Sequence, residues 1–195
     1  MTCNCVEKDF CVQAGETWHP VVRWGTGTLT SKAITAITRA TPVSITATAH
    51  GAPNGWPVAV TGVEGMIEIN ARRYPPQGDD WHYATVPDAN TVQLNDVSSA
   101  NYTTYSEDGA LVYDTPKDLT GVNFSLSIYN NPEHAGTPLA TLTNPTGITV
   151  ETTLKTITPL LQTAGLTWTL GYYRLMATEA SGVVTELMRG SITIE

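Results

Sequence analysis

Apolar and polar residues alternate with a period of two along much of this chain. The alternation is clearest at 122–129, and the same period recurs at 43–47, 58–60 and 92–94. Such a pattern turns one face of a strand toward a core and the other toward water. Turn signals rich in Gly, Pro and Asn, such as Asn54-Gly55, separate the strands every ten residues or so. The sequence therefore predicts an all-β fold.

The strands fall into two groups. Residues 34–113 hold five or six short strands, which is typical of a small barrel or sandwich. Residues 114–195 hold another five or six, fewer than the seven of an immunoglobulin-like sandwich, and a strand within residues 10–24 supplies the missing one. We therefore expect an immunoglobulin-like β-sandwich made of residues 10–33 and 114–195, with a β-barrel of residues 34–113 inserted after its first strand. Two tandem domains are the alternative.

Three further expectations concern segments without clean alternation. Residues 1–9 are predicted to be a flexible N-terminus, and the small residues of 25–33 a flexible segment. Residues 157–166 predict one short helix, with Pro159 in its first turn and Gly165 near its end.

Composition narrows the class of partner. Only 14% of the residues are charged, the net charge is −8, and no basic run is longer than Arg72-Arg73. A protein that binds nucleic acid directly needs a basic surface, so that class is excluded. No stretch approaches the ~20 apolar residues of a membrane helix, and the first thirty residues lack a secretion signal. We therefore expect no membrane insertion and a protein made in the cytosol.

Two groups of residues raise the question of a metal. Cys3, Cys5 and Cys11 with His19 are zinc-type ligands, but paired Cys-x-x-Cys spacing is absent, which favours free thiols. Asp79, Asp80 and His82 lie close together in the chain, and without a third oxygen donor at suitable spacing they favour a solvated loop. No metal ligand and no cofactor is predicted.

Catalytic residues are not predicted either. His50 before Gly51 resembles a general base, but a turn histidine that bonds nearby backbone is favoured. No Gly-x-Ser-x-Gly elbow marks a nucleophile. The chain is therefore expected not to be an enzyme.

The five tryptophans allow two interpretations. Trp18, Trp24 and Trp168 favour core packing, because an aromatic side chain buries a large area. Trp56 and Trp81 lie near predicted loops, where packing and a glycan-binding surface remain open alternatives.

A set of short motifs resembles a module of tailed-bacteriophage structural proteins that is labelled after the first catalytic cysteine half-domain of ubiquitin-activating enzymes. The motifs are Ala49-His50-Gly51, Asn54-Gly55, Gly62-Val63-x-Gly65-Met66, Glu68-x-Asn70 and the turn 88–91 before a strand ending Asn95-Asp96. Ala52, Ala71 and the longer loop 75–82 depart from the family pattern. The flanking segments 118–129 and 171–194 resemble the immunoglobulin-like domain that accompanies this module in phage tail, baseplate and neck proteins.

The resemblance implies a non-enzymatic component of a tailed-phage virion that acts by protein–protein docking. Its expected partners are other virion structural proteins, with several symmetric copies in each particle, assembled in the host cytoplasm. A capsid decoration protein is one alternative, and a module that binds a host-surface glycan or receptor is the other.

Overall fold

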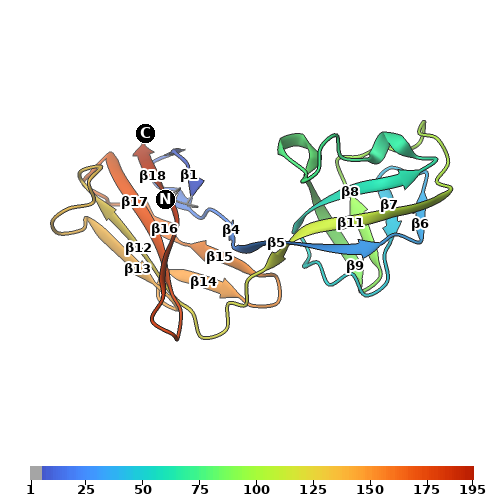
Figure 1. Cartoon of the computed structure of the whole chain (residues 1–195). Helices are drawn as coiled ribbons and strands as arrows, with labels where there is room; N and C mark the ends of the chain where they lie inside the picture. Colours follow the sequence, from blue (N-terminus) through green and yellow to red (C-terminus); the bar gives the residue numbers. More distant parts are fainter. Residues whose placement is uncertain (1–5) are drawn as a thin grey trace. The chain divides into compact units, whose positions relative to one another are not determined.

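The computed structural model describes residues 6–195, and it confirms the all-β prediction. Strands make up 51% of the chain and helices 3%, so no helical layer contributes to the core. The helical residues form two short 3₁₀ turns, η1 (Ile67–Ile69) and η2 (Gly78–Asp80). Figure 1 shows the strands in chain order.

The chain divides into two compact units. The discontinuous unit comprises the chain up to Trp24 together with Asp118–Glu195, and the inserted unit comprises Gly25–Lys117. Residues 25–33 and 114–117 thus belong to the inserted unit, although the sequence placed both in the sandwich.

The segment predicted to be flexible at 25–33 is instead the long strand β5 (Gly25–Ala33). It pairs antiparallel with β11 (Glu107–Pro116), from Ala33 opposite Ala110 to Gly25 opposite Pro116. The glycine-rich sequence "GTGTL" hid this strand, because small residues have a weak intrinsic preference for strands. The strand forms nevertheless, since cross-strand pairing with β11 outweighs that preference. Position 25 also requires glycine for a steric reason, because a Cβ built there would lie 2.0 Å from Asp114 Oδ2.

The inserted unit is one seven-stranded antiparallel sheet around its own core. Its strand order is β5, β11, β8 (Pro57–Glu64), β9 (His82–Asp88), β10 (Thr91–Leu94), β7 (Val43–Thr46), β6 (Ala36–Thr38). The inward residues of the predicted alternation are buried, among them Val43, Ile45, Val58, Val60, Val92 and Leu94. Trp56 and Met66 complete the centre of this core.

The predicted closure of this sheet into a barrel is not confirmed. Across the described residues, the hydrogen-bonded ladder ends at β5 on one side and at β6 on the other. These end strands are consecutive in the chain. Ile34, which follows β5, donates its N–H to the carbonyl of Gly109 in β11. Thr35, which precedes β6, donates its N–H to the carbonyl of Thr46 in β7. The two ends of the sheet are therefore joined by the chain and not by a row of hydrogen bonds.

The discontinuous unit is sandwich-like. Its larger sheet has the order β1 (Val6–Glu7), β18 (Val184–Ile194), β17 (Leu170–Thr178), β12 (Asn123–Tyr129), β13 (Ala140–Thr143), and β2 (Phe10–Val12) also pairs with β18. The smaller sheets are β14 (Ile148–Glu151), β15 (Thr156–Pro159), β4 (Val22–Arg23) and the pair β16 (Leu161–Gln162), β3 (Thr17–Trp18). The clean alternation at 122–128 is confirmed, because its four apolar residues are all buried.

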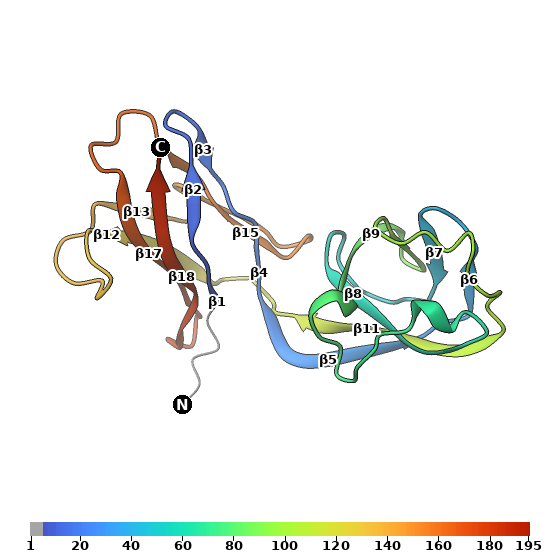
Figure 2. The ribbon, with the colours of Figure 1, turned by 90° about the horizontal axis from the view of Figure 1, so that it is seen from above.

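The N-terminal segment contributes to both sides of this core. β1 and β2 run parallel to β18, as Figure 2 shows, whereas β3 and β4 pair with β16 and β15. The predicted single strand within 10–24 is therefore three short strands, and Val6–Glu7 of the predicted flexible terminus forms a fourth. Gly190 permits the close approach of the N-terminal segment, because a Cβ there would lie 2.0 Å from the carbonyl oxygen of Lys8.

The predicted helix at 157–166 is wrong. Residues of this segment form β15 and β16, in which Ile157, Pro159 and Leu161 are buried. The burial therefore has the period of a strand. Leu160, which is 40% exposed, hid that period in the sequence by filling an outward position with an apolar residue.

Candidate functional site

His50 holds a turn of the inserted unit, as the sequence favoured. Its side chain is 1% exposed. Nδ1 accepts a hydrogen bond from the N–H of Ala52 at 3.1 Å, so the proton is on Nε2, which donates to the carbonyl of Asp88 at 3.2 Å. Both ring nitrogens are therefore engaged with backbone, which is the arrangement of a structural histidine.

The same turn is tied to β11. The hydroxyl of Tyr113 donates to the carbonyl of His50, and burial raises the pKa of this phenol. The indole Nε1–H of Trp56 donates to the carbonyl of Asp114 at 2.8 Å. Two aromatic side chains thus anchor the loop 49–56 to one strand, each with its polar tip satisfied.

The glycine-containing motif at 62–70 fixes a second loop. The amide of Asn70 bonds both backbone groups of Val63, accepting at 2.8 Å and donating at 2.9 Å. Gly65 has a φ of +81°, and a Cβ built there would lie 2.3 Å from the carbonyl oxygen of Thr104. This position requires glycine for both reasons.

Glu68 and the turn at 88–91 also fix loops through hydrogen bonds. Glu68 Oε1 accepts from the N–H and the hydroxyl of Thr103, both at 2.9 Å, and these bonds lower the pKa of the Glu68 carboxyl. The N–H of Asn90 bonds Asp88 and lowers its pKa, while Asn90 Oδ1 accepts from the N–H of Ala49. The polar residues of the recognisable motifs therefore bond the loops of this unit to one another.

The sequence raised two groups of possible metal ligands and favoured neither, and the structure describes the second group and part of the first. Cys3 and Cys5 lie outside the described residues. Cys11 is an exposed free thiol in β2, and Nδ1 of His19 lies 2.7 Å from the carbonyl oxygen of Thr17. Within residues 6–195, no cluster of three or more His, Cys, Asp or Glu side chains is placed to hold a metal ion.

Asp79, Asp80 and His82 have separate surroundings. Asp80 is 8% exposed, and its carboxylate accepts from the N–H groups of Arg72 and Gln77 at 3.0 and 3.1 Å. These backbone bonds lower the pKa of Asp80. His82 Nδ1 lies 2.7 Å from Asp96 Oδ2, and Asp79 is exposed. Asp80 is therefore a loop-holding residue, which differs from the solvated loop that the sequence favoured.

Four of the five tryptophans pack against cores. Trp56 is 2% exposed, which decides for packing and against the alternative of a glycan-binding surface at this residue. In the discontinuous unit, Trp18 makes an edge-on contact with Phe10 and a tilted contact with Tyr173, with ring centroids 5.2 Å from each. Trp24 and Trp168 are partly buried against the same core. Only Trp81 keeps the second interpretation open.

Trp81 lines a depression on the inserted unit that we name the aromatic groove. Its volume is about 500 Å³, and it is lined by Pro57, Gly78, Trp81, Tyr83 and Asp114. Tyr83 is 66% exposed, whereas Trp81, Pro57 and Asp114 are half-buried. The volume falls within the range of pockets for small ligands.

Strand register explains why these residues meet. Pro57 in β8 is paired with Tyr83 in β9. Val112 in β11 is paired with Ala59, so two residues further along Asp114 stands beside Pro57. Trp81 precedes Tyr83 by two residues in extended backbone, and side chains two apart in a strand share a face. The groove thus spans three strands on the outer face of the sheet.

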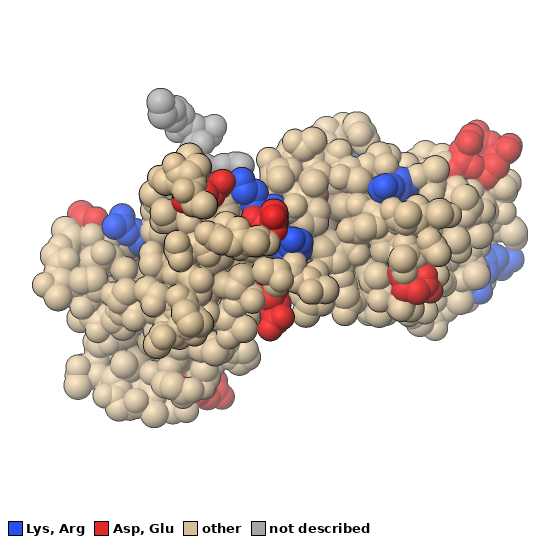
Figure 3. Space-filling model, turned by 90° about the horizontal axis from the view of Figure 1, so that it is seen from below, with Lys and Arg blue, Asp and Glu red and all other residues tan. Residues whose placement is uncertain are grey.

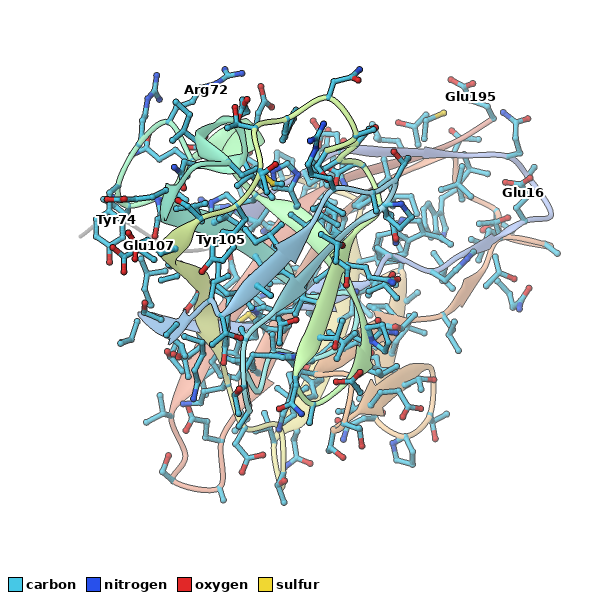
Figure 4. The ribbon with its side chains drawn as sticks, turned by 90° about the vertical axis from the view of Figure 1, so that its right-hand side faces the viewer. Glu16, Arg72, Tyr74, Tyr105, Glu107 and Glu195 are labelled. Atoms are coloured by element: carbon cyan, nitrogen blue, oxygen red, sulfur yellow. The ribbon has the colours of Figure 1, made fainter. Side chains whose placement is uncertain are left out.

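Charge is sparse elsewhere on the surface. Figure 3 shows a mostly uncharged face on which some acidic and basic groups stand apart and others lie side by side. Arg72 and Tyr74 extend from the loop between β8 and β9 (Figure 4), and Tyr74 is 71% exposed. Among the described residues, no helix has the length and hydropathy needed to cross a membrane.

The comparisons with known proteins add no family. No protein-family model matches the chain, and no curated protein matches it either. The function must therefore be argued from the residues and the fold.

Proposed function

We propose that the protein is a non-enzymatic structural component of a tailed-phage virion, located in the tail, neck or baseplate. It acts by docking on other virion proteins, in several symmetric copies per particle, and it is assembled in the host cytoplasm. The motif resemblance and the all-β composition of two compact units support this proposal.

One observation carries the proposal: the polar residues of the motifs bond backbone atoms of neighbouring loops. His50 and Asn70 each make two contacts with backbone atoms, and Glu68 accepts from the N–H and the hydroxyl of Thr103, all within the inserted unit. Side chains held in this way define the shape of a loop and do not leave a nucleophile and a base facing a substrate. A rigid surface of fixed shape suits repeated docking. Capsid decoration is a variant of the same role.

A host-glycan or receptor module is the second candidate, and the aromatic groove favours it. The exposed Tyr83 and the half-buried Trp81 offer flat apolar faces with polar tips at this depression, which is a surface that a ligand can occupy.

A complementation experiment separates the two candidates. Particles are produced from a phage genome that lacks the gene, with the wild-type chain or a Trp81→Ala, Tyr83→Ala variant supplied in trans. The structural role predicts that omission of the protein stops assembly or releases detached appendages. The recognition role predicts complete particles whose adsorption to host cells is lost in the variant. Normal particles and normal adsorption without the protein would contradict both roles.

A further inference from the structure

The aromatic groove combines one acidic group with apolar surface. Pro57, Trp81 and Tyr83 supply apolar and aromatic atoms, and Asp114 supplies a carboxylate to the lining. Asp114 Oδ1 accepts from the N–H of Gly27 at 2.9 Å, which fixes the carboxylate beside β5. An ionised carboxylate has about four acceptor positions, so its bonds to the backbone of Gly27 and Thr26 leave it able to accept more.

The surroundings of Asp114 favour a positive ligand. Burial raises the pKa of the Asp114 carboxyl, against the opposing effect of its bonds to Gly27 and Thr26. The charged form is therefore poorly solvated, and a cation placed beside it would restore the lost solvation. Tyrosine and tryptophan rings also attract cations through the negative potential of their faces.

The charge of the whole unit acts in the same direction. Residues 25–117 contain nine acidic and five basic residues, so the unit is negative at neutral pH. Such a field attracts basic partners and repels acidic ones. A saccharide offers no charge to Asp114 and needs several directional polar groups, of which this lining supplies few.

We propose that the aromatic groove binds an exposed lysine or arginine side chain of a partner protein, with its cation beside Asp114 and its methylene stem against Trp81 and Tyr83. This inference rests on the proposed docking function and specifies the chemistry of the partner. A basic side chain fits because its stem is apolar and its head is charged.

The inference is tested by nuclear magnetic resonance titration of the full isotope-labelled chain. The probes are the capped peptides acetyl-Gly-Lys-Gly-amide and acetyl-Gly-Arg-Gly-amide, with acetyl-Gly-Gln-Gly-amide as the neutral match and methyl α-glucopyranoside as the saccharide. We expect saturable shifts of the Trp81 indole signal and the Tyr83 amide with both basic peptides. The glutamine peptide is expected to bind at least about fivefold more weakly than the basic peptides.

Two variants locate the effect. Asp114→Asn keeps an oxygen acceptor for Gly27, so the fold is retained, and it should weaken binding of the basic peptides about fivefold. Glu64→Gln removes one negative charge from the same strand as Pro57 but outside the groove lining, and binding should be unchanged. The amide spectrum of each variant verifies that it is folded.

Three results would overturn the inference: equal weakening by both variants, saturation by the glucoside alone, or no saturable shift with any probe. Failure of the proposed function has a different signature. In that case the basic peptides bind as expected, but purified particles assemble normally without the protein.

Discussion

Replacement of Gly65 by alanine tests whether close loop packing shapes the inserted unit. The position has a φ of +81°, and an L-residue in left-handed backbone costs about 1–2 kcal/mol. The added Cβ would also lie 2.3 Å from the carbonyl oxygen of Thr104 and 2.8 Å from the amide nitrogen of Ser106. Both neighbours are backbone atoms, so relief requires movement of the loop, at a further cost of about 1–3 kcal/mol. We expect Gly65→Ala to destabilise the inserted unit by about 2–5 kcal/mol.

Gly27→Ala is the matched control. Gly27 has nearly the same φ, +79°, but no atom lies within 4 Å of a Cβ built there. Its cost should therefore be the backbone strain alone, about 1–2 kcal/mol.

Hydrogen exchange with mass spectrometry measures both variants, because it reports each unit separately. Peptides covering β8 and β11 give the opening free energy of the inserted unit, and peptides covering β17 and β18 serve as an internal reference. Each 1.4 kcal/mol of destabilisation accelerates exchange about tenfold when exchange follows opening. Equal acceleration by the two alanines would refute the reasoning, since the contact with Thr104 would then contribute nothing.

Three further predictions follow from hydrogen bonds. Asn70→Ala removes two bonds to one β8 residue and should cost about 2 kcal/mol in the inserted unit, measured by the same exchange; an unchanged rate would contradict the role of the motif. Tyr173→Phe removes the 2.6 Å bond to the carbonyl of Lys8, so exchange in β18 should rise about tenfold while β8 is unaffected. Acid should unfold the chain, because several carboxyls have a lower pKa in the folded state than their unfolded values of 3.8 (Asp) and 4.5 (Glu). Their contribution to stability is complete above these unfolded values. It is lost as the pH falls through the folded pKa values. The carboxyls concerned are Asp9, Glu68, Asp80, Asp88 and Asp118. Circular dichroism across pH 2–7 measures the effect, and a stability that rises on acidification below pH 4 would contradict the prediction.

The sequence predicted strands well where alternation was clean and failed where one residue broke it. The buried residues of 122–128 were visible because every outward position is polar. At 157–162, exposed Leu160 and the turn former Pro159 resembled a helix start, and pairing with Ile148 decided otherwise. The edge strand β5 lacks the alternation of apolar and polar residues that would reveal it in the sequence. It forms because β11 offers a strand with which its backbone can pair.

The aromatic groove was only half predictable. Trp81 was singled out because it lies near a loop, but Trp56 has the same sequence signal and is in the core. The difference is the hydrogen bond from Trp56 to Asp114, which depends on a strand 58 residues away. Tyr83 was missed, because its outward position follows from the burial of the neighbouring Ala84, which the sequence alone does not show.

The central proposal is that this chain is a docking component of a tailed-phage particle, and its presence in that particle is the most direct test. Purified virions are separated into heads and tails, and the polypeptide in each fraction is quantified against a structural protein of known copy number. The account predicts that it travels with the tail, neck or baseplate fraction, in a number that matches the rotational symmetry of that structure. A protein that is absent from washed particles, or present in less than one copy per particle, would contradict the claim.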